Sequence, residues 1–301
     1  MDRKDFIRNS ILISSGCIIA PNLLSQESKI KTNSKLTILH TNDTHSNIDP
    51  FPKNHHKYPG KGGVSRRFNL IQKVRSEEDN VLLLDAGDIF QGTPYFNKFN
   101  GVLEMKLMSL LGYDAATIGN HDFDGGMDGF VNAKSSANFP FLCSNYDFKN
   151  TPIDGHTKVY TIIRKGNLKI GIFGLGVELK GLVPDKKFGE TIYIDPIDIA
   201  NHIALDLKSK GCDLVICLSH LGYEYKSNKV SDRILAKKTR NIHLIIGGHT
   251  HTFLDKPTEE KNIDGNTVLI NQVGWAGINI GRIDFTFEKK IFSKNDLLLV
   301  E

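Results

Sequence analysis

The sequence predicts a single α/β domain, and three observations support this prediction. Short apolar runs rich in valine, isoleucine and leucine recur along the chain, as expected of strands. Segments whose apolar residues lie three and four positions apart stand between several of these runs, as expected of amphipathic helices. The runs lack a clean alternation of polar and apolar residues, which indicates strands covered on both faces. Alternating strands and helices are typical of an α/β fold.

The expected elements follow from these two patterns. The apolar runs that we expect to contain strands are 35–41, 80–88, 114–122, 139–145, 168–176, 212–220, 242–250, 267–273 and 278–287. The segments that we expect to form helices are 62–78, 101–113 and 198–211. No internal repeat and no low-complexity linker divides the chain, so we expect one folded domain over residues 35–290.

The composition is that of an ordinary globular protein. Of the 301 residues, 40% are apolar and 24% are charged, and the formal net charge is +4. The basic residues form no long tract, so no nucleic-acid partner is expected. Cys143, Cys212 and Cys217 stand in apolar runs outside any Cys-x-x-Cys pattern, and we expect small buried side chains rather than a disulfide framework.

Residues 1–25 have the pattern of an export signal. Arg3, Lys4 and Arg8 precede the apolar stretch ILISSGCIIAPNLL, which is too short to span a bilayer, so we expect no transmembrane anchor. The stretch DRKDFIR resembles the twin-arginine signal, with lysine in place of the second arginine. We therefore expect a periplasmic or extracellular protein. The alternatives are a lipoprotein anchored through Cys17 and a helix frayed from the body of the protein.

Polar side chains follow five of the expected strands, where α/β folds commonly place their chemistry. They are Asp43 and His45, Asp88, the group Asn120, His121, Asp122 and Asp124, then His220, and finally His249 and His251. Taken singly, each has a common structural use as a turn former, a helix cap or a core histidine. Five strand ends that all deliver such side chains, several with glycine beside them, indicate a functional site.

The residue types at these strand ends predict a metal site. Imidazole, carboxylate and amide donors without thiolate suit Mn, Zn, Fe or Co in a catalytic site. Seven donors are too many for one tetrahedral ion, but they suit two divalent ions that share a carboxylate about 3.5 to 4 Å apart. In an extended segment His249 and His251 would project to the same side with Cα atoms about 6.6 Å apart, close enough to serve neighbouring ions.

The order of these residues resembles the calcineurin-like metallophosphoesterases, and the surrounding sequence is similar to the catalytic domain of the 5′-nucleotidase family. The segments that carry the resemblance are LHTNDTHSNI, GGVSRR, DAGDIFQGTPYF, LGYDAATIGNHDFDGG, LSHLG, IIGGHTHT and NIGRIDF. They run from about Leu36 to Phe287. The resemblance implies a four-layer α/β/β/α sandwich of two mixed sheets flanked by helices, with a two-metal site at one end.

The resemblance also implies a role for each site residue. The first ion would be held by Asp43, His45, Asp88 and His251. The second would be held by Asp88, Asn120, His220 and His249, so that Asp88 bridges the two ions. His121 and Asp124 would form the catalytic pair beside the metals. Asp122 stands where the family has glutamate, which keeps the charge, and we expect this difference to matter little.

The function that the resemblance implies is hydrolysis of phosphate monoesters, such as nucleoside 5′-monophosphates. A water held between two dications loses its proton near neutral pH, and the hydroxide attacks phosphorus in line with the leaving oxygen. His121, oriented by Asp124, would stabilise the phosphoryl oxygens or assist the leaving group. Arg66 and Arg67 could reach a phosphate, although a role on the helix surface is their default interpretation.

Full-length 5′-nucleotidases of this type carry a C-terminal domain that grips the nucleoside. The sequence ends about where the linker to that domain would begin, so we expect the domain to be absent and a separate protein to be a possible source of it. Two alternatives stay open. The same site could act on phosphodiesters, nucleotide sugars or sulfur esters, or the chain could be a subunit that needs a partner for function.

Overall fold

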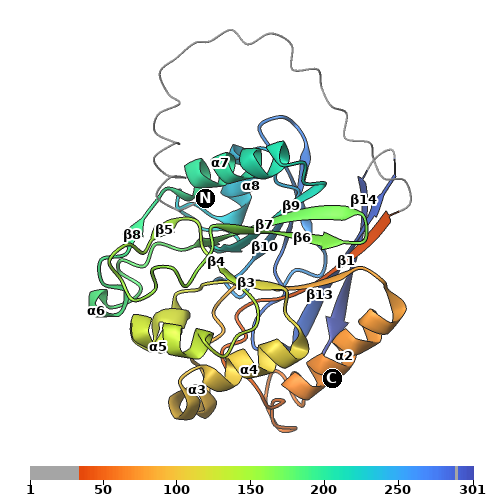
Figure 1. Cartoon of the computed structure of the whole chain (residues 1–301). Coiled ribbons are helices and arrows are strands. Elements are labelled where there is room, and N and C mark those ends of the chain that lie inside the picture. The colour runs from red at the N-terminus through yellow and green to blue at the C-terminus, as the bar shows by residue number, and fades with distance from the viewer. Residues whose placement is uncertain (1–33, 289–290) are drawn as a thin grey trace, which may run out of the picture.

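The computed structural model describes residues 34–288 and 291–301, and two six-stranded sheets form its centre (Figure 1). The first sheet has the order β14 (Ile291–Leu299), β13 (Asn279–Phe287), β1 (Ser34–Thr41), β2 (Val81–Asp85), β3 (Ala115–Thr117) and β4 (Phe141–Leu142). The second has the order β11 (Thr258–Lys261), β12 (Thr267–Asn271), β10 (Leu244–Gly247), β9 (Leu214–His220), β7 (Leu168–Gly176) and β6 (Tyr160–Lys165). A small third sheet pairs β5 (Tyr146–Asp147) with β8 (Ile192–Tyr193).

Both large sheets are mixed. Strands β1 to β4 run parallel, while β13 is antiparallel to β1 and β14 is antiparallel to β13. In the second sheet β7, β9, β10 and β12 run parallel, and the antiparallel strands β6 and β11 form its two edges. The parallel strands of each sheet therefore end on the same side, which is where the loops with the polar residues begin.

Helices cover the outer face of each sheet and complete four layers (Figure 1). The helices are α2 (Val64–Glu77), α3 (Pro94–Phe99), α4 (Val102–Leu111), α5 (Gly126–Lys134), α6 (Asp185–Phe188), α7 (Pro196–Ser209) and α8 (Asp232–Lys238), with one 3-10 turn, η1 (His121–Phe123). Helices α2, α4 and α5 lie below the first sheet in the figure, and α7 and α8 lie above the second. The expected α/β/β/α sandwich with two mixed sheets is confirmed.

The continuous apolar runs follow from these layers, because successive side chains of a strand point to opposite faces and both faces are covered. In β1, Leu36 and Ile38 pack into the core between the two sheets, whereas Leu39 packs toward α2 and α4. Similarly, in β9 Ile216 faces the first sheet, whereas Cys217 packs toward the residues of α7 and α8. Both faces of a central strand therefore need apolar side chains.

The expected long elements are present, and the missed ones are short or lie at edges. The helices expected over 62–78, 101–113 and 198–211 are α2, α4 and α7, each with ends within two residues of expectation. The expectation missed α3, α5, α6 and α8 and the strands β5, β6, β8, β11 and β14. The three cysteines outside the N-terminal segment are buried as expected.

The N-terminal segment lies outside the described residues. The expected export signal over residues 1–25 and the alternative at Cys17 both fall in it. Within the described residues, no helix is long and apolar enough to cross a membrane.

Candidate metal centre

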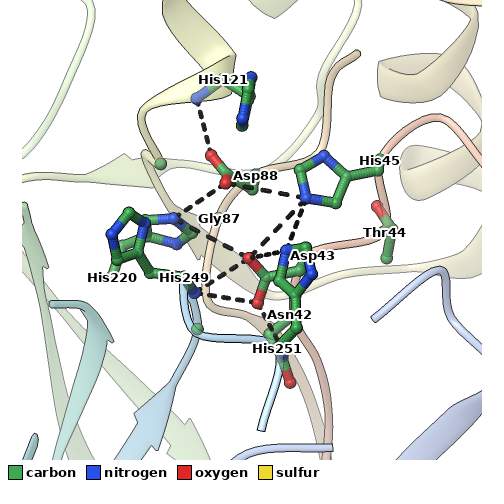
Figure 2. A network of polar contacts seen from close by, with 12 residues as sticks. Asn42, Asp43, Thr44, His45, Gly87, Asp88, His121, His220, His249 and His251 are labelled. Atoms are coloured by element: carbon green, nitrogen blue, oxygen red, sulfur yellow. Dashed lines mark hydrogen bonds and ion pairs between the residues drawn. The ribbon is translucent and has the colours of Figure 1, made fainter. Parts of the chain in front are cut away.

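The carboxyl ends of five parallel strands, three from the first sheet and two from the second, meet at one end of the sandwich. Strands β1, β2 and β3 end at Thr41, Asp85 and Thr117, and strands β9 and β10 end at His220 and Gly247. The loops that follow them bring the expected ligands together (Figure 2). The site is therefore built from both sheets rather than from one.

Asp43, His45 and His251 form the first of two groups whose ligand atoms all lie within 4.8 Å of one another. The Nε2 atom of His45 lies 3.0 Å from Nε2 of His251. Oδ1 of Asp43 lies 3.4 Å from Nε2 of His251 and 4.0 Å from Nε2 of His45. Two ligand atoms that each lie about 2.1 Å from a shared ion are roughly 3.0 to 4.2 Å apart, depending on the angle between them, so the three separations are compatible with one divalent ion.

Asp88, His220 and His249 form the second group, again with all ligand atoms within 4.8 Å of one another. Oδ2 of Asp88 lies 3.1 Å from Nε2 of His220 and 3.8 Å from Nε2 of His45. This carboxylate therefore faces both groups, as a shared ligand of two ions would.

Asn120 lies beside the second group. The backbone N–H of the next residue, His121, donates to Oδ1 of Asp88 at 2.8 Å. The side-chain Oδ1 of Asn120 is buried and has no hydrogen-bond partner, and Nε2 of His220 also lacks a partner in hydrogen-bonding geometry. Buried polar atoms are normally satisfied, so two such atoms next to a carboxylate indicate the place of a cation.

The site contains two buried carboxylates, those of Asp43 and Asp88, which need positive charge nearby. Asp43 is 0% exposed and Asp88 is 1% exposed. Among the described residues, every ion-pair partner of these two carboxylates is a histidine. A buried carboxylate is costly unless positive charge lies next to it. Two divalent ions would supply that charge, so the residues present fit a dinuclear centre.

Backbone carbonyls orient two of the histidines. Nδ1 of His220 lies 2.7 Å from the carbonyl oxygen of Ala86, and Nδ1 of His45 lies 3.2 Å from that of Phe90. A carbonyl oxygen only accepts, so Nδ1 carries the proton in both rings and Nε2 keeps its lone pair for the site. Partners of this kind fix the ring orientation of metal-binding histidines.

Burial and the carboxylates of Asp43 and Asp88 have opposite effects on the pKa values of the histidines in the site. Burial lowers the pKa of His249 to about 4, and burial also lowers the pKa of His45, so both rings stay neutral as ligands must. Burial disfavours charge on His220 too, but Asp88 outweighs it and raises the pKa of His220 to about 10. The pKa of Asp88 is lowered, because the neighbouring histidines outweigh its burial.

Five of the seven expected ligands have a strained, left-handed backbone conformation. Left-handed φ values occur at Asp43 (49°), His45 (46°), Asp88 (55°), His249 (72°) and His251 (51°). Such a conformation costs about 1 to 2 kcal/mol at a residue other than glycine, and it clusters at functional sites. The expectation of an extended segment around His249 and His251 is wrong. The left-handed turns instead aim His249 at the second group and His251 at the first.

His121 and Asp124 lie at the rim of the centre. Nδ1 of His121 is 2.8 Å from Oδ2 of Asp124. The side chain of His121 is 39% exposed, and its ring lies edge-on to that of His45 with centroids 5.3 Å apart. The hydrogen bond that His121 donates to Asp124 outweighs the opposing burial and raises the pKa of His121. This imidazole is therefore a half-exposed group beside the two ligand groups, with its protonated form favoured by Asp124.

Asp122 is a functional residue whose role the sequence did not reveal. Its carboxylate accepts four backbone N–H bonds, from Asp88 (3.1 Å), Ile89 (2.9 Å), Phe90 (3.1 Å) and Gly119 (2.8 Å). Burial and the nearby Asp88 raise the pKa of Asp122 to about 7, against the effect of these donors. Asp122 thus ties the loop that carries Asp88 to the loop that carries Asn120. The sequence signals were its place directly after His121 and the acidic residue that the family has at this position.

Asn42 supports the first group in a similar way. Its Nδ2 donates to Oδ2 of Asp43 at 2.6 Å and to the carbonyl of Gly274 at 2.6 Å, and its Oδ1 accepts from the N–H of Val273 at 2.9 Å. The Asp43 loop is thereby tied to the segment after β12. Nothing in the sequence separated Asn42 from an ordinary turn residue.

Arg66 and Arg67 lie in α2 and bond to nearby backbone. Arg67 is 5% exposed and its Nη2 donates to the carbonyl of Asn47 at 3.1 Å. Nη1 of Arg66 donates to the carbonyl of Gly60. These bonds hold the loop before α2. Arg66 is partly exposed, in line with a role on the helix surface, whereas that expectation is wrong for Arg67, which is buried.

We predict that Asp122→Asn weakens metal binding about 10- to 100-fold, the range for residues that orient metal ligands. The amide nitrogen would replace one carboxylate oxygen and cannot accept the two backbone N–H bonds made there, so unfolding should also become easier by about 1 to 3 kcal/mol. Calorimetric titration with Mn²⁺ and denaturant unfolding measure the two effects. Asp128→Asn, at an exposed position of α5, is the control. Unchanged Mn²⁺ affinity in Asp122→Asn would contradict this role.

Comparisons with known proteins agree with this geometry. Residues 36–253 match the family described as calcineurin-like phosphoesterase. Snake venom 5′-nucleotidase from Gloydius brevicauda is 34% identical over 277 residues, which cover 85% of this chain and 46% of that protein. The trifunctional nucleotide phosphoesterase protein YfkN of Bacillus subtilis (strain 168) is 32% identical over 290 residues, which cover 85% of this chain and 18% of that protein.

A solved structure gives the same result. The 5′-nucleotidase precursor from Thermus thermophilus superimposes with a TM-score of 0.79 at 31% identity, over 88% of this chain and 54% of that one. The chain thus spans about half the length of the Gloydius and Thermus proteins. Since the family match covers most of the described residues and includes both ligand groups, this chain belongs to the calcineurin-like phosphoesterase family.

Proposed function

We propose that the chain hydrolyses phosphate monoesters, with nucleoside 5′-monophosphates as substrates, at a centre of two divalent ions. The observation that carries this proposal is the pair of ligand groups joined by one carboxylate, that of Asp88, which faces both. The ions would be held by Asp43, His45, Asp88, Asn120, His220, His249 and His251. The names of the relatives, 5′-nucleotidases and phosphoesterases, support the same reaction class.

Two bound divalent ions would lower the pKa of a water molecule and offset the negative charge of a phosphate. The chain's own residues complete the site. The four amide bonds to Asp122 fix the backbone of the loop that carries Asp88, and the N–H of His121 holds its carboxylate, which would fix where a phosphoryl group can lie. The backbone carbonyls of Ala86 and Phe90 hold two imidazoles in the orientation that ligands need.

His121 is proposed to act on the substrate directly. Since Nδ1 is engaged by Asp124, the other ring nitrogen is the one that can donate to a phosphoryl oxygen or to the leaving oxygen. The raised pKa of His121 keeps that nitrogen protonated at higher pH than an ordinary histidine would be. Asp124 is a positioning residue, because it orients the ring and raises its pKa.

Phosphate release from a panel of esters tests the proposed function. We expect release from nucleoside 5′-monophosphates after addition of Mn²⁺, Co²⁺ or Zn²⁺, and loss of it after treatment with a chelator. Asp88→Ala should abolish release, because the shared carboxylate is removed, while the surface variant Asp128→Asn should keep it. A protein that binds metal but releases phosphate from no ester would overturn the proposal. Phosphodiesters and nucleotide sugars in the panel separate the alternative substrates.

Asp124→Asn should shift the pH dependence of the reaction. If His121 acts in its protonated form, activity falls as pH rises through the pKa of His121. Loss of the Asp124 carboxylate lowers that pKa, so the descending limb of kcat against pH should move to lower pH. His121→Ala should lose about 100-fold or more of kcat and lack this limb. A limb at unchanged pH in Asp124→Asn would show that another group titrates there.

We also propose a partner that would set the nucleotide preference, and a location outside the cytoplasm. The relatives are longer than the matched region, so a separate protein that supplies a nucleoside-binding domain is a proposed partner. Export to the periplasm or the cell exterior is proposed from the basic and apolar pattern of residues 1–25. Adding the candidate partner to the assay and fractionating the host cells test these two points.

A further inference from the structure

A group of aromatic rings extends from the metal centre across the neighbouring surface. We call it the aromatic cluster, and it consists of Phe51, His55, Tyr58, Phe253 and Trp275. It begins at His251, whose imidazole lies parallel to the Trp275 indole, with an interplanar angle of 5° and centroids 5.7 Å apart. One face of the His251 ring, an expected metal ligand, therefore lies against this cluster.

Successive ring contacts lead outward from Trp275. Its ring lies 5.9 Å from that of Phe51 and 6.2 Å from that of Tyr58. The Tyr58 ring is in turn nearly parallel to that of Phe253, at 27° and 6.2 Å. Phe253 is 43% exposed. An exposed aromatic surface that continues into a catalytic centre is typical of a ligand-binding surface.

The backbone holds the outer ring in place. Phe253 follows His251 by two residues, and it forms a bridge with Val273. The N–H of Gly274 donates to the carbonyl of Thr252 at 2.9 Å. The Phe253 ring lies directly on Gly274, where a Cβ atom would stand 2.2 Å from it. The same pair of segments therefore fixes His251, Phe253 and Trp275 relative to one another.

The loop that carries the other rings is also fixed. The N–H of Phe51 donates to the carbonyl of Lys61 at 2.8 Å, and the N–H of Tyr58 donates to Nδ1 of His55 at 2.9 Å. The His55 ring stacks on Tyr58 at 9° and 5.8 Å. Preformed rings bind a planar group at little entropic cost, because they need no ordering on binding.

We propose that the aromatic cluster is a ring-stacking subsite of the phosphate ester site, and that it binds a planar aromatic group carried by the leaving alcohol. This inference rests on the proposed function and adds a specificity surface to it within this domain. Bases stack on aromatic side chains through their π-faces, without a need for particular hydrogen bonds. An ester anchored by its phosphate at the two ligand groups would then place its ring against Phe253 and Tyr58.

The first test is a binding measurement that needs neither metal nor turnover. Trp275 is the single tryptophan of the chain, so its emission reports on the cluster alone. Adenosine should quench this emission saturably in metal-free protein, whereas ribose should not. Phe253→Leu keeps an apolar side chain but removes the ring, and it should weaken adenosine binding about fivefold to tenfold. Phe99→Leu, at an exposed position of α3, should bind adenosine like the unchanged protein.

The second test compares two esters that differ only in the base. The ratio of kcat/KM for adenosine 5′-monophosphate to that for ribose 5-phosphate should fall about fivefold to tenfold in Phe253→Leu and stay constant in Phe99→Leu. An equal ratio in all three proteins, together with no quenching by adenosine, would overturn the subsite even if both esters are hydrolysed. Quenching without hydrolysis of either ester would support the subsite while the proposed function fails.

A protein partner is the competing occupant of the cluster. If a second copy of the chain covers these rings, Trp275 emission will depend on protein concentration, and Phe253→Leu will abolish a dimer seen by sedimentation. That result would overturn the subsite.

Discussion

The burial of two carboxylates in one small space is the constraint on which the rest of the site depends. Asp43 and Asp88 come from the loops after β1 and β2, and both face histidines from the second sheet. Two buried negative charges in one site are unfavourable unless cations lie between or beside them. The neutral imidazoles of His45 and His249, the unpartnered oxygen of Asn120 and the hydrogen-bonded Nδ1 atoms all follow from that requirement. The fold thus prepares a place for positive charge before any ion arrives.

Holding the carboxylates there requires local strain and close approach. Five of the expected ligands adopt left-handed backbone, and two glycines let neighbouring loops come near enough. A Cβ atom at Gly119 would stand 2.1 Å from Oδ1 of Asp88, and one at Gly248 would stand 2.9 Å from the carbonyl of Ala86. The layered core and the amide bonds to Asp122 offset this strain, because they fix the loops from behind. The backbone, rather than flexible side chains, therefore determines where the expected ligands lie.

The aromatic cluster would give the same centre a second kind of selectivity. The ligand groups would recognise charge on a phosphate, which many esters share, whereas a ring surface would distinguish esters by the alcohol that they carry. Both features arise from the same pairing of the segment after His251 with the segment after β12. Binding of the phosphate and binding of the ring would then both depend on these two paired segments rather than on separate domains.

The sequence by itself determined the α/β class, the long helices and the set of polar residues at the strand ends, because apolar periodicity and residue type are local properties. It could not locate short elements such as α6, β5 and β8, whose few residues carry little periodic signal. The family resemblance implied how the residues divide into two groups, and the tertiary structure shows how that division arises, since Asp43 meets His251 from the far end of the chain and the left-handed turns at His249 and His251 separate neighbours in sequence. The tertiary structure also decided the roles of Asp122, Asn42 and Trp275, because their contacts come from loops that approach only when the two sheets pack together.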